Sequence, residues 1–249
     1  MIDRVIGRGS WLARPPGSRR LVAVRRVAVL GFVIGAVCGP GRGGVARADV
    51  DADLAALVTG LPACDAARAH CLGIRLHMTV GEDGPIAAAD WLGVQLAAAN
   101  RHFAALDVGF QVVGIDALPA SGARIATRRE RDDLSAGRLA GTVLHVFIIG
   151  QLDDVDQPGK VIRGVTWHTR KDDRKYVLVS TVAPDRVLAH ELGHVFGLPH
   201  SRYAVSIMNK TDRTDPPVEQ RTFAEEEIAA MRPQLKRLLH DKVIAEVAK

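Results

Sequence analysis

The sequence predicts an α/β (α+β) fold with a twisted, mostly parallel sheet and an antiparallel edge strand, on three observations. Strand-like and helix-like segments alternate along the chain, as they do where helices cross over between parallel strands. One segment has the apolar spacing of a long amphipathic helix. The last two strand candidates are separated by a short connection, so they are expected to form a hairpin.

The first strand is expected over residues 72–79, because apolar and polar side chains alternate there. A long helix is predicted from Pro85 to Leu106, because its apolar residues recur at steps of four and three. The apolar positions of this helix are Ala88, Leu92, Leu96, Ala99 and Phe103.

Further strands are predicted at residues 109–115, 143–149, 161–168 and 175–182. The charged stretch at 128–138 is either another helix or a solvated face. The tight spacing of the last two strands places 161–168 antiparallel to its neighbour, at the edge of the sheet.

Composition limits the class of protein. The chain has 249 residues, 47% of them hydrophobic, which is typical of one soluble domain with attached segments. Its formal net charge is +5, but residues 1–48 hold nine arginines against Asp3 alone, which is 9 − 1 = +8. The remainder therefore carries 5 − 8 = −3. Because the basic charge lies in the leader, nucleic acid is not expected as a partner.

The leader has the features of an export signal. An apolar run from Val27 to Cys38 follows the arginines and is too short to span a bilayer as a permanent helix. Ala46 and Ala48 give a small-x-small cleavage site, so a mature chain is expected to begin near Asp49. The protein is then secreted or otherwise extracytoplasmic, without stable membrane association. An uncleaved amino-terminal anchor is the alternative.

The expected organisation is a leader at 1–48, a short N-terminal segment at 49–71 and one folded domain at 72–249, which we expect to be monomeric. Cleavage would remove Cys38 and leave Cys64 and Cys71, seven positions apart. In an exported chain, two such cysteines most simply form a local disulfide.

A histidine cluster points to a metal. A helix is expected to begin at Pro184, and on it His190 and His194 lie one turn apart on a common face. Gly197 can end the helix in a left-handed conformation, so that the chain turns and brings His200 to the same point. Three neutral imidazoles suit zinc and leave its fourth position to water, as in catalytic sites.

The stretch HELGHVFGLPH, residues 190–200, resembles the extended zinc signature of the metzincin clan, H-E-x-x-H-x-x-G-x-x-H, at every fixed position. Met208 resembles the methionine turn of that clan, and Ser201 together with the short spacing to Met208 makes the matrixins the most similar members. The resemblance implies a metzincin-like zincin domain with an active-site helix and a C-terminal helix.

Two departures from the matrixin pattern are visible. The histidine and aspartate pattern of the matrixins' structural zinc site is not recognisable between His145 and Asp173, and no tyrosine follows Met208. The segment around Cys64 faintly resembles the matrixin propeptide segment whose cysteine blocks the zinc, but a disulfide leaves no thiolate for that role.

The resemblance implies a zinc metalloendopeptidase that acts on protein or peptide substrates lying along residues 161–168. One Zn²⁺ would be held by His190, His194 and His200, and Glu191 would be the general base that activates a water on the zinc. The alternative is a secreted zinc-containing module that binds a protein without cutting it.

Two further features carry predictions. Asp153, Asp154 and Asp156 ahead of Gly159 form either a Ca²⁺ site or a solvated acidic turn, and the turn is favoured. A capping box formed by Thr222 and Glu225 is expected to start the last helix.

Overall fold

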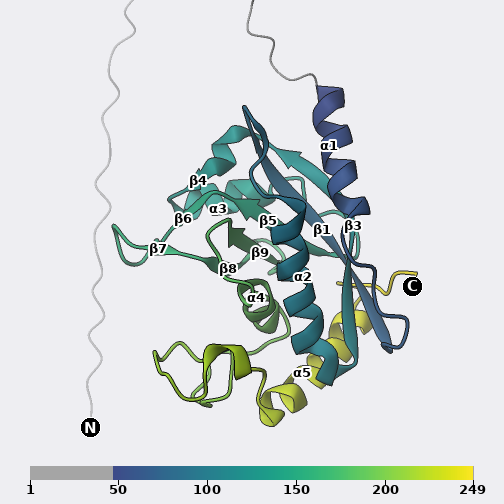
Figure 1. The fold of residues 1–249 in the computed structure, drawn as a ribbon, viewed down its shortest axis with the longest axis vertical. Coiled ribbons are helices and arrows are strands. Elements are labelled where there is room, and N and C mark those ends of the chain that lie inside the picture. The colour runs from purple at the N-terminus through teal and green to yellow at the C-terminus, as the bar shows by residue number, and fades with distance from the viewer. Residues whose placement is uncertain (1–46, 249) are drawn as a thin grey trace, which may run out of the picture. The chain divides into compact units, whose positions relative to one another are not determined.

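The computed structural model describes residues 47–248, so the predicted leader up to residue 46 lies outside the described residues. Its main sheet has the strand order β2-β1-β5-β9-β8, with β3 paired to β1 (Figure 1). The strands are β1 (His70–Gly81), β2 (Gly84–Pro85), β3 (Val108–Leu118), β5 (Leu144–Ile149), β8 (Gly164–His168) and β9 (Lys175–Ser180).

The predicted fold class is confirmed by the pairing of these strands. β3, β1, β5 and β9 run parallel to one another. β8 is antiparallel to β9 and ends the strand order, and the two-residue β2 is antiparallel to β1. Parallel neighbours need long crossovers, and the short connection between β8 and β9 allows only a hairpin. The edge strand and the hairpin are therefore as expected from the sequence.

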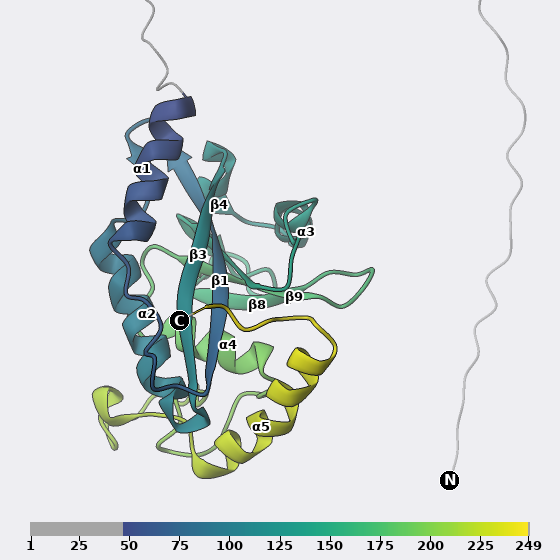
Figure 2. The same cartoon turned by 90° about the vertical axis from the view of Figure 1, so that its right-hand side faces the viewer.

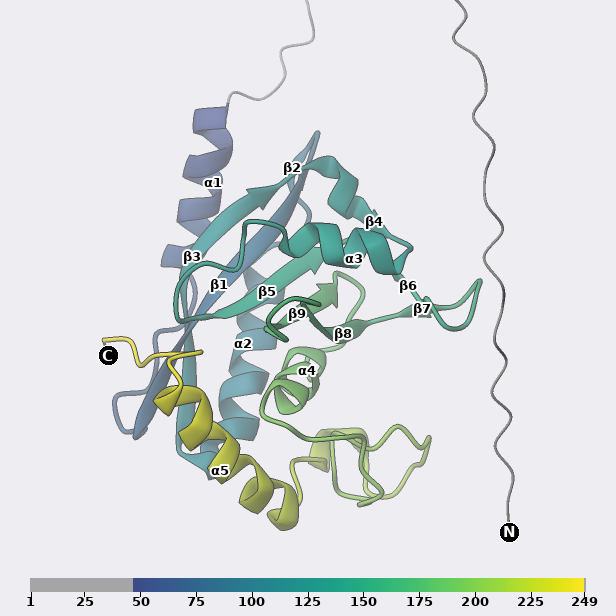
Figure 3. The same ribbon diagram turned by 180° about the vertical axis from the view of Figure 1, so that it is seen from behind.

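Helices lie on both faces of the sheet. The helices are α1 (Arg47–Thr59), α2 (Ala89–Phe103), α3 (Arg128–Ser135), α4 (Val187–Val195) and α5 (Glu225–His240). Seen edge-on, α1 and α2 cover one face and α3 lies over the other (Figure 2), and the view from behind shows α3 in front of the strands (Figure 3). None of the helices within residues 47–248 has the length and apolar character needed to cross a membrane.

The alternation along β1 separates two cores. Ile74, Leu76 and Met78 are buried in the main core, which also contains the apolar faces of α2 and α4. His77 and Thr79 point to the opposite face of the sheet, because successive strand side chains alternate. The second core lies on that face, beneath α3 and its flanking loops, and is formed by Leu118, Ile125, Phe147, Ile149, Leu152, Tyr176 and Leu178.

The segment at 49–71 packs on the domain. Leu54 of α1 is only 2% exposed and belongs to the main core. Cys64 and Cys71 form a disulfide with their Cα atoms 6.0 Å apart. It lies against β3, where a Cβ added to Gly109 would come within 2.6 Å of the Cys64 sulfur. The N-terminal segment is thereby held to the strand that follows α2.

The strand predicted at 161–168 is divided in the structure. Residues Val161–Ile162 form β7, which pairs with β6 (Gln151–Asp153) in a small second sheet completed by β4 (Arg124–Ile125). Between β7 and β8, the carbonyl of Arg163 accepts a hydrogen bond from the Ser180 N–H at 2.9 Å. The single-strand prediction was wrong because the chain changes its pairing partner there, which local alternation does not reveal.

Helix boundaries also differ from the predictions. The long helix is α2 followed by the 3₁₀ turn η1 (Ala104–Leu106), with Ala88 as its exposed N-cap. α4 begins at Val187 rather than Pro184, after a turn closed by a Val187 N–H to Pro184 carbonyl bond of 3.1 Å. A proline at the start of such a turn has the same fixed φ as one at a helix start, so the sequence does not distinguish them.

The predicted capping box of α5 is wrong. Ala224 is the N-cap, and its N–H donates to Glu227 Oε2 at 2.9 Å. A 3₁₀ turn, η3 (Val218–Gln220), precedes this region. Alanine has no side-chain acceptor, so Glu227 supplies only half of a capping box.

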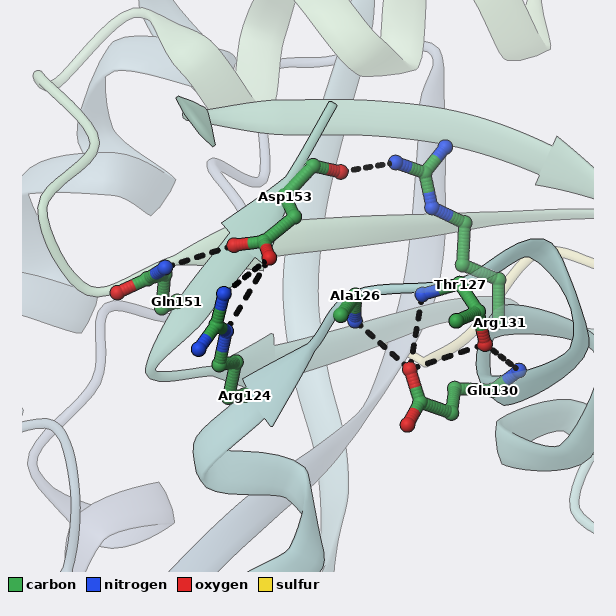
Figure 4. A network of polar contacts seen from close by, with 7 residues as sticks. All are labelled: Arg124, Ala126, Thr127, Glu130, Arg131, Gln151 and Asp153. Atoms are coloured by element: carbon green, nitrogen blue, oxygen red, sulfur yellow. Dashed lines mark hydrogen bonds and ion pairs between the residues drawn. The ribbon is translucent and has the colours of Figure 1, made fainter. Parts of the chain in front are cut away.

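The acidic turn after β6 is occupied by internal partners. Asp153 forms an ion pair with Arg124 at 2.6 Å and its carbonyl accepts from Arg131, as Figure 4 shows. Asp156 pairs with Arg128, and Asp154 accepts the N–H groups of the turn. Because these carboxylates already have partners, the structure does not support the calcium interpretation.

Candidate metal centre

α4 is held in place by a buried glutamine on the neighbouring helix. Gln95 of α2 donates from Nε2 to the carbonyls of Pro184 at 2.9 Å and Ala183 at 3.2 Å. Its Oε1 accepts the N–H of Leu188 at 3.2 Å, in the first turn of α4. Leu188, Leu192 and Val195 form an apolar stripe along α4 and are buried. The apolar stripe and Gln95 together fix which face of α4 points outward.

Three histidines meet on that outward face. The ligand atoms of His190, His194 and His200 all lie within 4.8 Å of one another. His190 Nδ1 is 2.8 Å from the carbonyl of Ile207, and His194 Nδ1 is 2.7 Å from that of Leu198. Because a carbonyl only accepts, each Nδ1 carries the hydrogen and each Nε2 keeps its lone pair. Two of the three imidazoles are thus oriented as metal ligands.

The spacing of the nitrogens fits zinc. His194 Nε2 and His200 Nε2 are 3.2 Å apart. Two nitrogens at about 2.0–2.1 Å from a tetrahedral zinc ion lie roughly 3.3–3.4 Å from each other. Burial lowers the pKa of His190 and His200 to about 4, which keeps both rings neutral. The residues present therefore suit one zinc ion.

The turn after α4 returns His200 to the helix. Gly197 has φ +91°, a left-handed conformation that glycine adopts without a Cβ clash. The Leu198 N–H donates to the Gly193 carbonyl at 3.0 Å, and the Gly197 N–H to that of His194 at 3.1 Å. These bonds satisfy the last carbonyls of α4 and reverse the chain, as glycine at this position predicted.

Met208 lies directly beneath the helix. Its side chain is fully buried, and a Cβ added to Gly193 would come within 2.7 Å of its sulfur. Ser206 Oγ donates to the carboxylate of Glu227, 2.7 Å from Oε2 and 2.8 Å from Oε1, and accepts the Met208 N–H at 2.9 Å. The methionine turn is thereby joined to α5. The sequence shows no local signal that pairs Ser206 with Glu227, because they are 21 residues apart.

Glu191 is the buried carboxylate of the site. It is 5% exposed, and burial raises its pKa to about 7, against hydrogen bonds that lower it. Thr166 of β8 takes part in this, since its Oγ1 is 3.0 Å from Oε2 of the carboxylate. The same hydroxyl is 2.7 Å from the Glu191 main-chain carbonyl. Sequence reasoning missed Thr166, because nothing near it in the chain indicates contact with α4.

A cleft of about 1490 Å³ contains the histidines and Glu191. One wall is β8, and another is the segment after the methionine turn, which includes Lys210. Lys175, at the start of β9, donates to the His194 carbonyl at 2.7 Å and adds positive charge. Cys64 is not among the residues that line this cleft.

Within residues 47–248, these three histidines are the only group of three or more potential ligands close enough to share a metal ion. His145 instead pairs with His77, whose Nε2 lies 3.0 Å from His145 Nδ1. Both side chains are buried. Asp173 pairs with His168 on the surface at 2.8 Å. The part of the chain that the structure describes therefore provides one metal centre.

One comparison with known protein families covers this centre. The family model of the matrixins, peptidase family M10, matches residues 143–232. A comparison with curated protein sequences found no match.

Distant likenesses to solved structures were also found. Metalloproteinase-II from Bacteroides fragilis is 15% identical with a TM-score of 0.45, and the match covers 68% of this chain but only 54% of that one. Archaemetzincin from Methanopyrus kandleri is 18% identical with a TM-score of 0.44, over 70% of this chain and 100% of that one. Over residues 143–232, which contain the three histidines and Glu191, the chain matches the matrixin family of zinc peptidases.

Proposed function

We propose that the protein is an exported zinc-dependent endopeptidase of the metzincin type. The observation that carries this proposal is the meeting of three convergent imidazoles and a buried carboxylate in one cleft. His190, His194 and His200 hold one zinc ion through neutral nitrogens, and Glu191 lies beside His190 on the same helix. A carboxylate is costly to bury without a partner or a role, which supports a chemical function for Glu191.

The chemistry follows from the positions of these side chains. When bound by the three neutral histidines, a zinc ion would supply Lewis acidity and positive charge for the hydrolysis of a peptide bond. Glu191 takes the proton of the water and delivers it to the leaving amine. His190 and His194 are kept in one tautomer by the carbonyls of Ile207 and Leu198.

The substrate is an extended peptide lying along β8. This strand is last in the sheet order, so within residues 47–248 one of its edges has no partner strand, and its residues line the cleft. An open strand edge offers N–H and C=O groups to a peptide backbone independently of its side chains. Peptide binding along Gly164–His168 places a scissile bond next to α4.

A second candidate is a zinc-containing module that binds a protein without cleaving it. The same cleft and the same open strand edge would serve such a module. Glu191 favours hydrolysis, because a binding module gains nothing from an acid buried beside its metal.

The test measures zinc content and peptide cleavage together. The wild-type protein should hold one zinc ion and cleave members of a peptide library, and a chelator should abolish cleavage. Glu191→Gln should keep the zinc and lose about 10²–10⁴-fold in turnover, because the base is gone while the ligands remain. Glu82→Gln, a change at an exposed acid outside the cleft, serves as control.

Two results would overturn parts of the proposal. Near-normal turnover of Glu191→Gln would exclude Glu191 as the base. A zinc-loaded wild type that cleaves no peptide would favour the second candidate, a zinc-containing module that binds a protein. Export is proposed from the leader alone, and amino-terminal sequencing of secreted protein should find a start near Asp49.

A further inference from the structure

Two residues on one face of the edge strand touch Glu191. Gly164 and Thr166 are two positions apart in β8, so they face the same side of the strand. The Thr166 hydroxyl lies 3.0 Å from Glu191 Oε2 and 2.7 Å from the Glu191 carbonyl. It has one hydrogen, which these two acceptors share. β8 therefore contacts both the side chain and the main chain of Glu191.

Gly164 provides the space that the carboxylate occupies. A Cβ at this position would lie 3.0 Å from Glu191 Cγ, 3.1 Å from Oε1 and 2.6 Å from Cγ1 of Val187. Gly164 is not among the glycines with a positive φ, so its backbone conformation is open to other residues. Glycine is required there by the close approach of α4, and any side chain would displace Glu191 or the helix.

We propose that Thr166 and Gly164 are positioning residues for Glu191, so that the strand that receives the substrate also sets the place of the base. Thr166 holds one carboxylate oxygen, Oε2, through its hydroxyl. Because Gly164 has no side chain, the carboxylate of Glu191 keeps its place in the cleft. The inference rests on the proposed peptidase function.

The geometry favours a positioning role for these residues rather than a purely structural one. A carboxylate attached to a flexible side chain loses efficiency when it is misplaced, and an error of about 1 Å can cost about 100-fold in rate. Thr166 lies 25 residues from Glu191 in sequence, so this contact exists only when β8 and α4 are packed together. Substrate alignment and base alignment thus depend on a single element.

The experiment compares Thr166→Val with Thr166→Ser in the zinc-loaded protein. Valine keeps the shape and removes the donor, whereas serine keeps the hydroxyl. We expect Thr166→Val to lower kcat about 10- to 100-fold with unchanged KM and zinc content, and Thr166→Ser to retain most of kcat. Thr79→Val is the matched control, because it removes a buried hydroxyl that bonds the Ile148 carbonyl at 3.0 Å outside the cleft. It should lower the melting temperature without changing kcat.

A second measurement does not depend on activity. Gly164→Ala should lower the melting temperature of the metal-free protein, and the loss should be smaller when Glu191 is also alanine, because part of the clash is removed. An equal loss of melting temperature with Glu191 and with alanine at position 191 would contradict the contact between Gly164 and Glu191. Full kcat of Thr166→Val, with an active wild type, would overturn this inference but not the proposed function. An inactive wild type would overturn the proposed function and this inference with it.

Discussion

Gly193 lies on α4 between the two helical histidines, and its missing side chain allows Met208 to pack beneath them. A Cβ there would come within 2.7 Å of the Met208 sulfur and 3.2 Å of Phe223 Cε1. Met208 and Phe223 are both buried, at 0% and 2% exposure, so neither has free space to move into. At the scale of single residues, the site depends on the lack of a side chain at Gly193 as well as on the histidine ligands.

Gly193→Ala should therefore lower the free energy of unfolding by about 1–3 kcal/mol, as overpacked cores do, and weaken zinc binding because α4 must shift. Urea denaturation and zinc titration measure the two effects. Gly93→Ala in α2 is the matched control, since no atom lies within 4 Å of an added Cβ there. That change should stabilise the protein by about 0.5–1 kcal/mol. Similar results for both variants would contradict the packing argument.

At the scale of elements, α4 is positioned by three neighbours. α2 reaches it through Gln95, β8 through Thr166, and the methionine turn through the Ile207 carbonyl, which accepts from His190. α5 supports that turn through Glu227. Each link joins segments distant in the sequence, so the orientation of the histidines is a property of the packed elements.

Gln95→Leu should separate the contribution of α2 from that of the apolar stripe. Leucine is of similar size, but it leaves the Leu188 N–H and the Ala183 carbonyl without the partner that Gln95 provides. An unpaired buried group costs about 1–3 kcal/mol, so unfolding should become easier by at least that amount, and the zinc affinity should fall. Unchanged stability in chemical denaturation would show that water replaces the glutamine.

The whole described molecule is a sheet with a core on each face, and the N-terminal segment is fastened to it by the disulfide. Cys64 and Cys71 are 7% and 1% exposed, and the Cys64 N–H also donates to Gln111 of β3 at 3.1 Å. Between the sheet and the α3 segment lies the buried pair His77 and His145, linked at 3.0 Å. These two features determine how the fold responds to reduction and to acid.

Cys64→Ser should destabilise the protein without raising its activity. The disulfide joins residues seven positions apart, and without it the unfolded chain gains conformational entropy. That gain lowers the free energy of unfolding by about 2–3 kcal/mol. Activity should not rise, because Cys64 does not line the cleft. Thermal melting and peptide cleavage test the two statements. A free thiol at Cys64, with activity released by a thiol-blocking reagent, would instead indicate a cysteine that blocks the zinc.

Stability should fall as the pH drops from about 6.5 to about 4. Burial lowers the pKa of His77 to about 4, helped by Arg75 and Arg138, and burial likewise lowers the pKa of His145 to about 4, helped by His77 and Arg174. Asp116 Oδ2 lies 3.5 Å from His77 Nδ1. Between the folded pKa and the unfolded value near 6.5, the unfolded chain binds more protons, so acid favours unfolding.

The expected slope is up to about 1.4 kcal/mol per pH unit for each histidine. Chemical denaturation at several pH values measures it, and His77→Phe should reduce the slope relative to wild type. The zinc ligands also take up protons in this range, and they contribute equally to both proteins. Identical slopes would show that His77 is not a source of the acid sensitivity.

The sequence by itself determined the features that depend on neighbours along the chain. Period-two alternation located β1, and the helical spacing of apolar residues located α2, because those patterns report which side of one element is buried. The spacing of His190, His194 and His200 around Gly197 brought the three histidines together in prediction, since a helical turn and a left-handed glycine are local geometry.

Tertiary structure alone decided the contacts between distant segments. Gln95 of α2 bonds α4, and Thr166 and Gly164 of β8 contact Glu191. Ser206 bonds Glu227 of α5. Each contact joins elements whose approach no local pattern encodes. The strand break at Arg163 and the arginine partners of the acidic turn were hidden for the same reason. Packing energy depends on which surfaces meet, and that is settled only when the whole chain has folded.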